Sequence, residues 1–117
     1  MFDEFVVGGS EGSFAEKAMS CSVQIRPAAE RDLAEAYAWY ERQKPGLGDV
    51  FLEYFELALE FIRDNPRAYV EVHRGLRRAA MRKFPYGVVF QANDDEVFIV
   101  GVIHARRHPR NWQARGT

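Results

Sequence analysis

The sequence LRRAAMRKFPYGVVFQ (residues 76–91), followed after a polar turn by EVFIVGVIHARRHPRNW (residues 96–112), decides the fold of this chain. Short runs rich in β-branched and aromatic residues predict strands, and a proline breaks the hydrogen-bond ladder between the first two. We place these strands at residues 76–84, 86–92 and 97–104. The last is apolar from Val97 to Ile103, which is typical of a central strand covered on both faces over part of its length.

Two helices are predicted before these strands. Pro27 suits the first turn of a helix that ends near Gln43. Its apolar side chains recur at helical spacing and share one face: Leu33, Ala36, Tyr37 and Tyr40. A second helix is predicted from about Asp49 to Arg63, and it is apolar around much of its circumference. The pair Asn65-Pro66 ends it, because proline disfavours helical geometry in the residue before it.

The order of these segments predicts an α+β fold. Residues 21–26 alternate weakly and predict a short N-terminal strand, and residues 69–73 predict an extended lead-in to the sheet. The strand is followed by a two-helix hairpin and an antiparallel β-meander of about three strands. We expect the helices to pack on one face of that sheet.

The first 18 residues differ from the rest of the chain. They contain a Gly- and Ser-rich stretch and four acidic residues against Lys17 alone. We therefore expect a flexible acidic extension over residues 1–18 and one domain over residues 19–117. Two explanations are open: translation starts at Met19, or the acidic piece is derived from a partner or a tag.

The composition favours a cytoplasmic protein. Cys21 is the single cysteine, so no internal disulfide can form, which fits a reducing compartment. No apolar run approaches the roughly 20 residues that a membrane-spanning helix needs. Asp3 and Glu4 stand where a signal peptide carries positive charge. We expect no membrane association.

The formal net charge of -1 hides a strong asymmetry along the chain. Residues 1–62 hold 5 Lys and Arg against 12 Asp and Glu, whereas residues 63–117 hold 11 against 5. One surface of the folded domain is therefore expected to be basic. It could face nucleic acid, an acidic protein or the acidic half of the same molecule.

Arginines follow the first strand of the meander. On a continuous strand, Arg78 and Arg82 would project from the same face with Ala80 between them. Arginine presents a planar fork of donors that suits phosphate or carboxylate. The alternative is an edge strand that charge protects against aggregation.

A second basic group comes after the last strand: His104, Arg106, Arg107, His108 and Arg110. His104 could transfer protons, since histidine titrates near neutrality, or it could be a hydrogen-bonded turn residue. No third metal ligand accompanies the two histidines, and no cofactor motif is present, so we expect neither metal nor cofactor. Trp112 could stack on a base or pin the tail to the sheet.

An ordered set of segments resembles the RelE/ParE superfamily of bacterial type II toxins. The set covers residues 21–112: the first strand, the helix 28–37, the helix closed by Asn65-Pro66, Phe84-Pro85-Tyr86 and the closing Val102–Arg107. The resemblance implies a small toxin neutralised by a cognate antitoxin, with the two forming a hetero-oligomer. Antitoxins of this kind wrap the toxin with a disordered, often acidic segment that folds on binding.

The superfamily divides by target. RelE-like members cleave mRNA on the ribosome without metal, holding the phosphate with basic residues on the sheet and often using a C-terminal tyrosine. ParE-like members are reported to poison DNA gyrase without a catalytic site of their own. In this sequence the tyrosine of the middle strand, Tyr86, precedes Gly87, where the RelE pattern has arginine. Trp112 approximates the tyrosine position, and its indole is not an ordinary proton donor and acceptor.

The resemblance is therefore nearer the ParE, or plasmid stabilisation, branch. It implies growth inhibition by binding gyrase, and it favours a protein that is not an enzyme. The alternatives are a metal-independent, ribosome-dependent mRNA endoribonuclease and a degenerate, non-toxic member that only binds an antitoxin. If there is catalysis, the candidate residues are Arg78, Arg82, Arg107 and His104. The candidate binding residues are Arg78, Arg82, Arg106, Arg107, Arg110 and Trp112.

Overall fold

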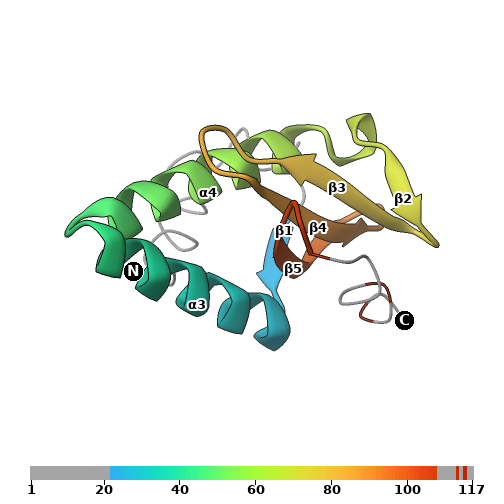
Figure 1. The fold of residues 1–117 in the computed structure, drawn as a ribbon. Helices are drawn as coiled ribbons and strands as arrows, with labels where there is room; N and C mark the ends of the chain where they lie inside the picture. Colours follow the sequence, from blue (N-terminus) through green and yellow to red (C-terminus); the bar gives the residue numbers. More distant parts are fainter. Residues whose placement is uncertain (1–21, 108–112, 114, 116–117) are drawn as a thin grey trace.

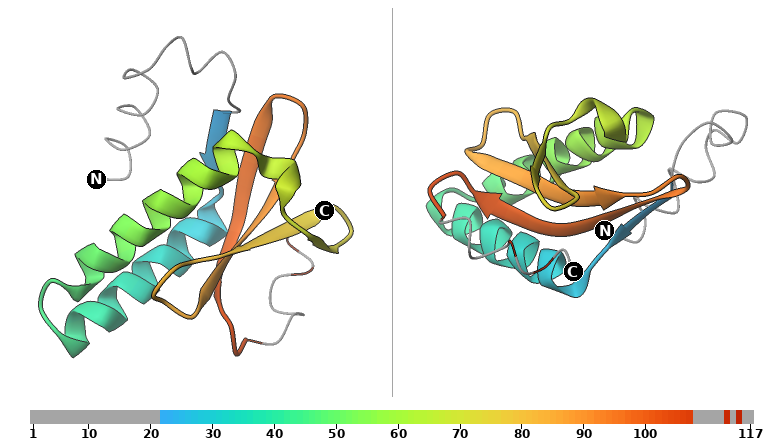
Figure 2. Two further views of the ribbon diagram at one scale, coloured as in Figure 1. Left: turned by 90° about the horizontal axis from the view of Figure 1, so that it is seen from above. Right: turned by 90° about the vertical axis from the view of Figure 1, so that its right-hand side faces the viewer.

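The computed structural model describes residues 22–107, 113 and 115. Its elements, in chain order, are β1 (Ser22–Ile25), α3 (Pro27–Gln43), α4 (Leu47–Asp64), the 3-10 turn η1 (Pro66–Ala68), β2 (Glu71–His73), β3 (Leu76–Ala80), β4 (Tyr86–Ala92) and β5 (Glu96–His104). The two helices form a hairpin against one face of the sheet (Figures 1 and 2). The predicted α+β fold is thus confirmed. The expected extension over residues 1–18 lies outside the described residues.

The sheet has five strands in the order β1-β5-β4-β3-β2. The meander β3-β4-β5 is antiparallel, β2 extends it at one edge, and β1 pairs in parallel with β5 at the other. The parallel pair spans only Ser22–Ile25 against Glu96–Ile99, so β1 covers the first half of β5 alone. Within residues 22–107, the second half of β5 has no strand neighbour on that side.

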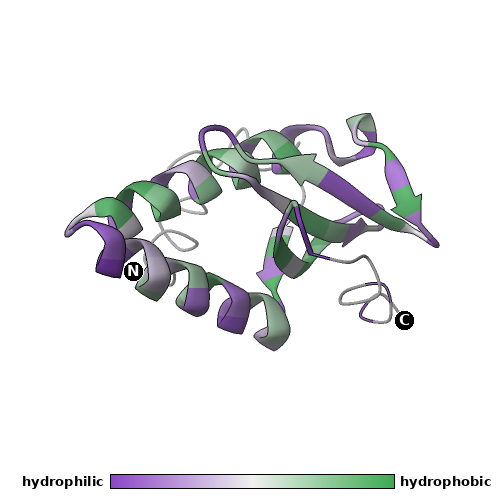
Figure 3. Ribbon diagram, viewed as in Figure 1, coloured by the Kyte–Doolittle hydropathy of each residue, from purple (hydrophilic) through white to green (hydrophobic). Residues whose placement is uncertain are grey.

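Apolar side chains fill both faces of the sheet. Toward the helices, fully buried residues of α3 and α4 meet those of the central strands: Leu33, Phe51, Phe55, Leu59, Ile62, Val88, Phe90, Val97 and Ile99. A smaller buried cluster lies on the opposite face: Leu76, Val89, Val100 and Ile103. The continuous apolar run of β5 is explained by this burial on both faces, as the sequence predicts. Figure 3 shows the hydrophobic centre of the sheet.

The carboxylate of Glu41 stabilises the connection between α3 and α4. Glu41 accepts hydrogen bonds from the backbone N–H groups of Gly46 (2.8 Å) and Gly48 (2.9 Å). These donors lie at the start of α4, where N–H groups have no partner within the helix. Gly48 also lets the helices approach, since a Cβ there would lie 2.8 Å from the Tyr37 ring. Glu41 therefore acts as the N-terminal cap of the next helix.

The predicted strand over residues 76–84 is too long. β3 ends at Ala80, and the N–H of Met81 closes the loop by donating to the carbonyl of Tyr86 (2.9 Å). Lys83 adopts a left-handed φ of 70°, which turns the chain before Pro85. The lead-in over residues 69–73 contains a true strand, β2, that pairs with β3.

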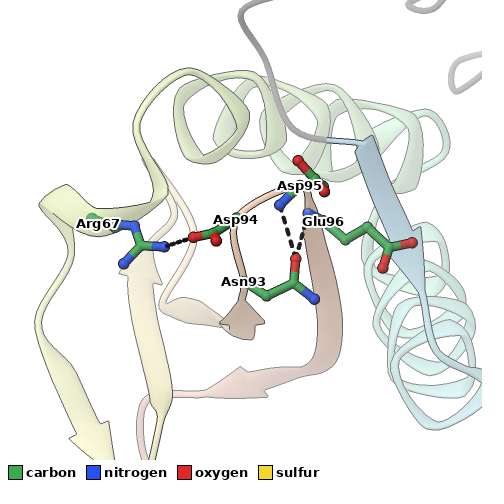
Figure 4. A network of polar contacts seen from close by, with 5 residues as sticks. All are labelled: Arg67, Asn93, Asp94, Asp95 and Glu96. Atoms are coloured by element: carbon green, nitrogen blue, oxygen red, sulfur yellow. Dashed lines mark hydrogen bonds and ion pairs between the residues drawn. The ribbon is translucent and has the colours of Figure 1, made fainter.

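The β4–β5 turn is fixed by side chains (Figure 4). The Asn93 side-chain oxygen accepts hydrogen bonds from the N–H groups of Asp95 (3.0 Å) and Glu96 (2.8 Å), as an Asx-turn requires. Arg67 of η1 pairs with Asp94 at 3.0 Å. Both of these side chains are largely exposed, so the pair is worth little on its own.

Candidate functional site

Arg78 lies on the sheet face opposite the helices, beside Gly87 of the neighbouring strand. The register pairs Arg78 with Val89 and Ala80 with Gly87. The guanidinium occupies the space next to Gly87, because a Cβ built there would overlap its Nε, Cζ and Nη2 atoms. Among the described residues, this half-buried guanidinium has no hydrogen-bond or ion-pair partner. A guanidinium in this position offers N–H donors that suit an anion.

Arg82 does not share this face with Arg78, so the predicted pairing of the two is wrong. The strand ends at Ala80, and the alternation of faces does not continue beyond it. The Arg82 guanidinium instead lies 5.9 Å from the centroid of the Phe61 ring of α4, on the helix side of the sheet. It lines a cavity of about 300 Å³ between α4 and β3.

His104 is a turn residue at the end of β5. Its Nδ1 accepts a hydrogen bond from the N–H of Arg106 (3.0 Å), and its carbonyl accepts one from the N–H of Arg107 (2.9 Å). The ring meets Tyr86 edge-on, with centroids 5.2 Å apart. Of the two roles open from sequence, the structure shows the hydrogen-bonded turn.

A groove of about 880 Å³ runs between α3 and the C-terminal end of β5; we call it the α3–β5 groove. The exposed Arg106 and Arg107 lie on one wall. Side chains of α3 form the other wall, and aromatic and apolar residues lie between them. The full lining is Asp32, Glu35, Ala36, Trp39, Tyr40, Arg42, Pro85, Tyr86, Val102, His104, Arg106 and Arg107. This combination of rings and cations was not expected from the sequence.

Two phenols of the groove are shifted in pKa. Burial raises the pKa of Tyr86, Arg107 lowers it in part, and the carboxylates of Asp32 and Glu35 raise it further. Burial also raises the pKa of Tyr40, with a smaller contribution from Tyr86. Both phenols are therefore neutral near pH 7 and able to donate a hydrogen bond to a ligand.

Asp32 closes the open edge of β5. Its carboxylate accepts a hydrogen bond from the N–H of Val102 (3.0 Å) and pairs with Arg115 at 2.7 Å. Arg115 also donates to the carbonyl of Val100 (3.2 Å). The Asp32 side chain is only 10% exposed. These two charged side chains thus bond one N–H and one carbonyl of the part of β5 that β1 does not pair with.

Some expected site residues, namely His108, Arg110 and Trp112, lie outside the described residues. Within residues 22–107, 113 and 115, no three His, Cys, Asp or Glu side chains are grouped as metal ligands. In that same part of the chain, neither helix has the length and apolar character needed to cross a membrane.

Sequence reasoning overlooked Trp39 and Arg42 of the groove, and Asp32 with Arg115 at its edge. A signal for Trp39 was present in the sequence, because it lies off the apolar face of its helix. In the structure Trp39 is 49% exposed. Asp32 looked like an ordinary acidic residue near the start of a helix. Its bond to Val102 joins residues far apart in the chain, which no local pattern reveals.

Comparisons with known proteins agree with this architecture. No curated protein matches the sequence. A chain of the solved structure described as "Chromosomal ParDE TA system from P. aeruginosa" matches with a TM-score of 0.65 and 15% identity, over 72% of this chain and 95% of that chain. At that identity the match supports the fold alone. Residues 23–109 match the model of the family "ParE toxin of type II toxin-antitoxin system, parDE". The chain therefore belongs to the ParE family of type II toxins.

Proposed function

We propose that this ParE-family toxin acts in the cytoplasm by binding DNA gyrase, without catalysing a reaction, and that a cognate antitoxin neutralises it. The observation that carries the proposal is the separation of the candidate catalytic side chains. Arg78 lies on the sheet face opposite the helices, Arg82 lies against α4, and His104 with Arg107 lies at the α3–β5 groove.

Cleavage of RNA would need these groups in one place. A general acid or base must come within hydrogen-bond reach of the proton that it transfers, and cations must converge on the developing charge. Arg78 lies beside Gly87, where a second arginine would complete a phosphate clamp. A lone arginine can hold an anionic group of a partner, which is sufficient for inhibition by binding.

An apolar and basic edge supports the antitoxin part of the proposal. Phe61, Val70 and Val72 are exposed large hydrophobic residues on α4 and around β2. Arg82 lies beside Phe61, so this edge combines apolar surface with positive charge. An acidic segment with interspersed apolar side chains would complement both features.

Expression without an antitoxin is the first test, and we expect growth to stop. The purified toxin should then inhibit supercoiling by gyrase, and added antitoxin should restore it. Arg78→Ala should weaken this inhibition more than Arg63→Ala, a charge-matched change on α4. In-codon cuts in cellular mRNA with normal supercoiling would overturn the gyrase proposal in favour of the endoribonuclease alternative. Normal growth would leave only a non-toxic, antitoxin-binding member.

A further inference from the structure

The α3–β5 groove has the chemical groups of a nucleotide-binding site. We infer that it binds one nucleotide, either free or at the end of a single strand. The base would lie against Trp39, and the phosphate would lie at Arg106 and Arg107. This inference goes beyond the proposed action on gyrase and does not depend on it.

The first argument is the state of Trp39. Its side chain is 49% exposed although the indole is the largest apolar side chain on α3. It meets Tyr40 at a right angle, with centroids 5.0 Å apart and planes at 90°, so the two rings are not stacked face to face. Aromatic faces of this kind stack on nucleobases and favour each base by a similar amount.

The second argument is the charge around that ring. Arg106 and Arg107 project from the turn after β5, and Arg42 lies one helical turn after Trp39 on the opposite wall. Among the described residues, none of these three guanidinium groups has a hydrogen-bond or ion-pair partner. Arginine binds phosphate through paired N–H donors, so guanidinium groups on both walls favour an anionic group between them.

The third argument distinguishes a nucleotide from an acidic peptide. Glu35 lines the same groove, and its exposed carboxylate would repel a uniformly acidic segment. A nucleotide carries its negative charge at one end and offers N–H donors on the base at the other. Glu35 can accept such donors, and the neutral phenols of Tyr40 and Tyr86 can donate to base or sugar oxygens. A volume of about 880 Å³ suits a ligand of this size.

The test measures binding of the whole purified chain to GMP, UMP, a fluorescein-labelled single-stranded oligouridine and inorganic phosphate, by calorimetry and fluorescence anisotropy. We expect a mononucleotide, the oligonucleotide or both to bind, with inorganic phosphate competing poorly. Binding of the mononucleotides indicates a free nucleotide as the ligand. Binding of the oligonucleotide alone indicates the end of a strand.

Matched variants locate the site. Trp39→Ala should weaken binding by about tenfold, in line with the loss of one base stack, whereas Phe61→Ala should not change it. The two rings are almost equally exposed, and Phe61 lies outside the groove. Arg106→Ala and Arg107→Ala should each weaken binding by about tenfold or more, against no change for Arg31→Ala on the exposed side of α3. Thermal melts of each variant report whether it is folded.

Three outcomes overturn the inference. One is that inorganic phosphate binds as tightly as the nucleotides, which means that the base is not recognised. Another is that folded Trp39→Ala binds as the wild type does. The last is that no nucleotide binds, while Trp39→Ala, Arg106→Ala and Arg107→Ala weaken the complex with the antitoxin; the groove would then be a protein interface. Gyrase inhibition is measured separately, so its failure is distinguishable from the failure of nucleotide binding.

Discussion

The Arg78 guanidinium fills the space that a side chain at position 87 would need. Packing against Arg78 therefore explains why position 87 is a glycine, independently of any lost catalytic role. The glycine and the arginine are a packed pair across two strands. A change at one position therefore has consequences that depend on the other.

The dependence can be measured with a double-mutant cycle. Gly87→Ala forces the end of the flexible Arg78 side chain to move, and we expect it to lower the free energy of unfolding by up to about 1 kcal/mol, less than overpacking of a rigid core. In an Arg78→Ala background the same change should cost little, because the space is empty. Urea unfolding of the four proteins gives the coupling energy. Equal costs in both backgrounds would contradict the packing that we describe.

A second prediction concerns the carboxylate at the edge of β5. Asp32→Ala leaves the Val102 N–H and the Arg115 guanidinium without their acceptor, and it should destabilise the protein by about 1–3 kcal/mol. Asp32→Asn keeps an acceptor oxygen and should cost less. Hydrogen exchange of the Val102 amide should accelerate in the alanine variant. Glu30→Ala, an exposed acidic position of the same helix, is the control and should leave that amide protected.

A third prediction concerns the helix hairpin. Glu41→Ala removes the acceptor of two backbone N–H groups at the start of α4, and we expect a loss of about 0.5–2 kcal/mol, as for other helix caps. Chemical denaturation measures it. Glu53→Ala on the exposed face of α4 removes the same charge without a cap and should change stability far less. A similar loss in both variants would mean that charge, and not capping, stabilises the hairpin.

The fourth prediction is a pH dependence. Burial raises the pKa of Glu56, and Glu60 and Glu53 raise it further. Ionisation of Glu56 is therefore less favourable in the folded chain than in the unfolded chain. Its contribution to the free energy of unfolding is fully present below the unfolded pKa and is lost as the pH rises through the folded pKa. Glu56→Gln should be more stable than the wild type at pH 7, by about 0.2–0.5 kcal/mol for relief of a like-charge helical pair. The difference should shrink below about pH 4, where the carboxyl is protonated in both states. Thermal melts across this range measure it, and a constant difference would contradict the assignment.

Local patterns in the sequence predict the elements of this fold well. Leu33 and Ala36 on α3 are buried as their spacing predicts, because burial of one face dominates helix placement. Phe51, Phe55 and Ile62 are buried on α4, which the sequence predicts to be apolar around much of its circumference. The continuous apolar run of β5 likewise predicts its central position. The end of β3 was missed, since the turn depends on a left-handed Lys83 that no residue preference indicates.

The candidate site was harder to predict. Arg78 and Arg82 follow an alternating pattern in sequence, yet the chain turns between them and separates them. Trp39 and Arg107 lie far apart in the sequence, yet both line the α3–β5 groove. Only the tertiary structure brings such residues together. From the sequence we expect Arg106 and Arg107 to bind a partner. From the structure we propose that they bind the phosphate of a nucleotide.

The place of β5 between β1 and β4 determines when this protein can become a folded toxin. β5 is the last strand of the described sheet in sequence, and both the first strand and the meander depend on it for their hydrogen bonds. During synthesis, the apolar surfaces of the helical hairpin and β1 that pack on β5 stay uncovered until that strand has emerged. Contacts of such long sequence separation slow folding. A nascent chain of this topology thus passes through a late interval in which apolar surface that β5 later covers is exposed.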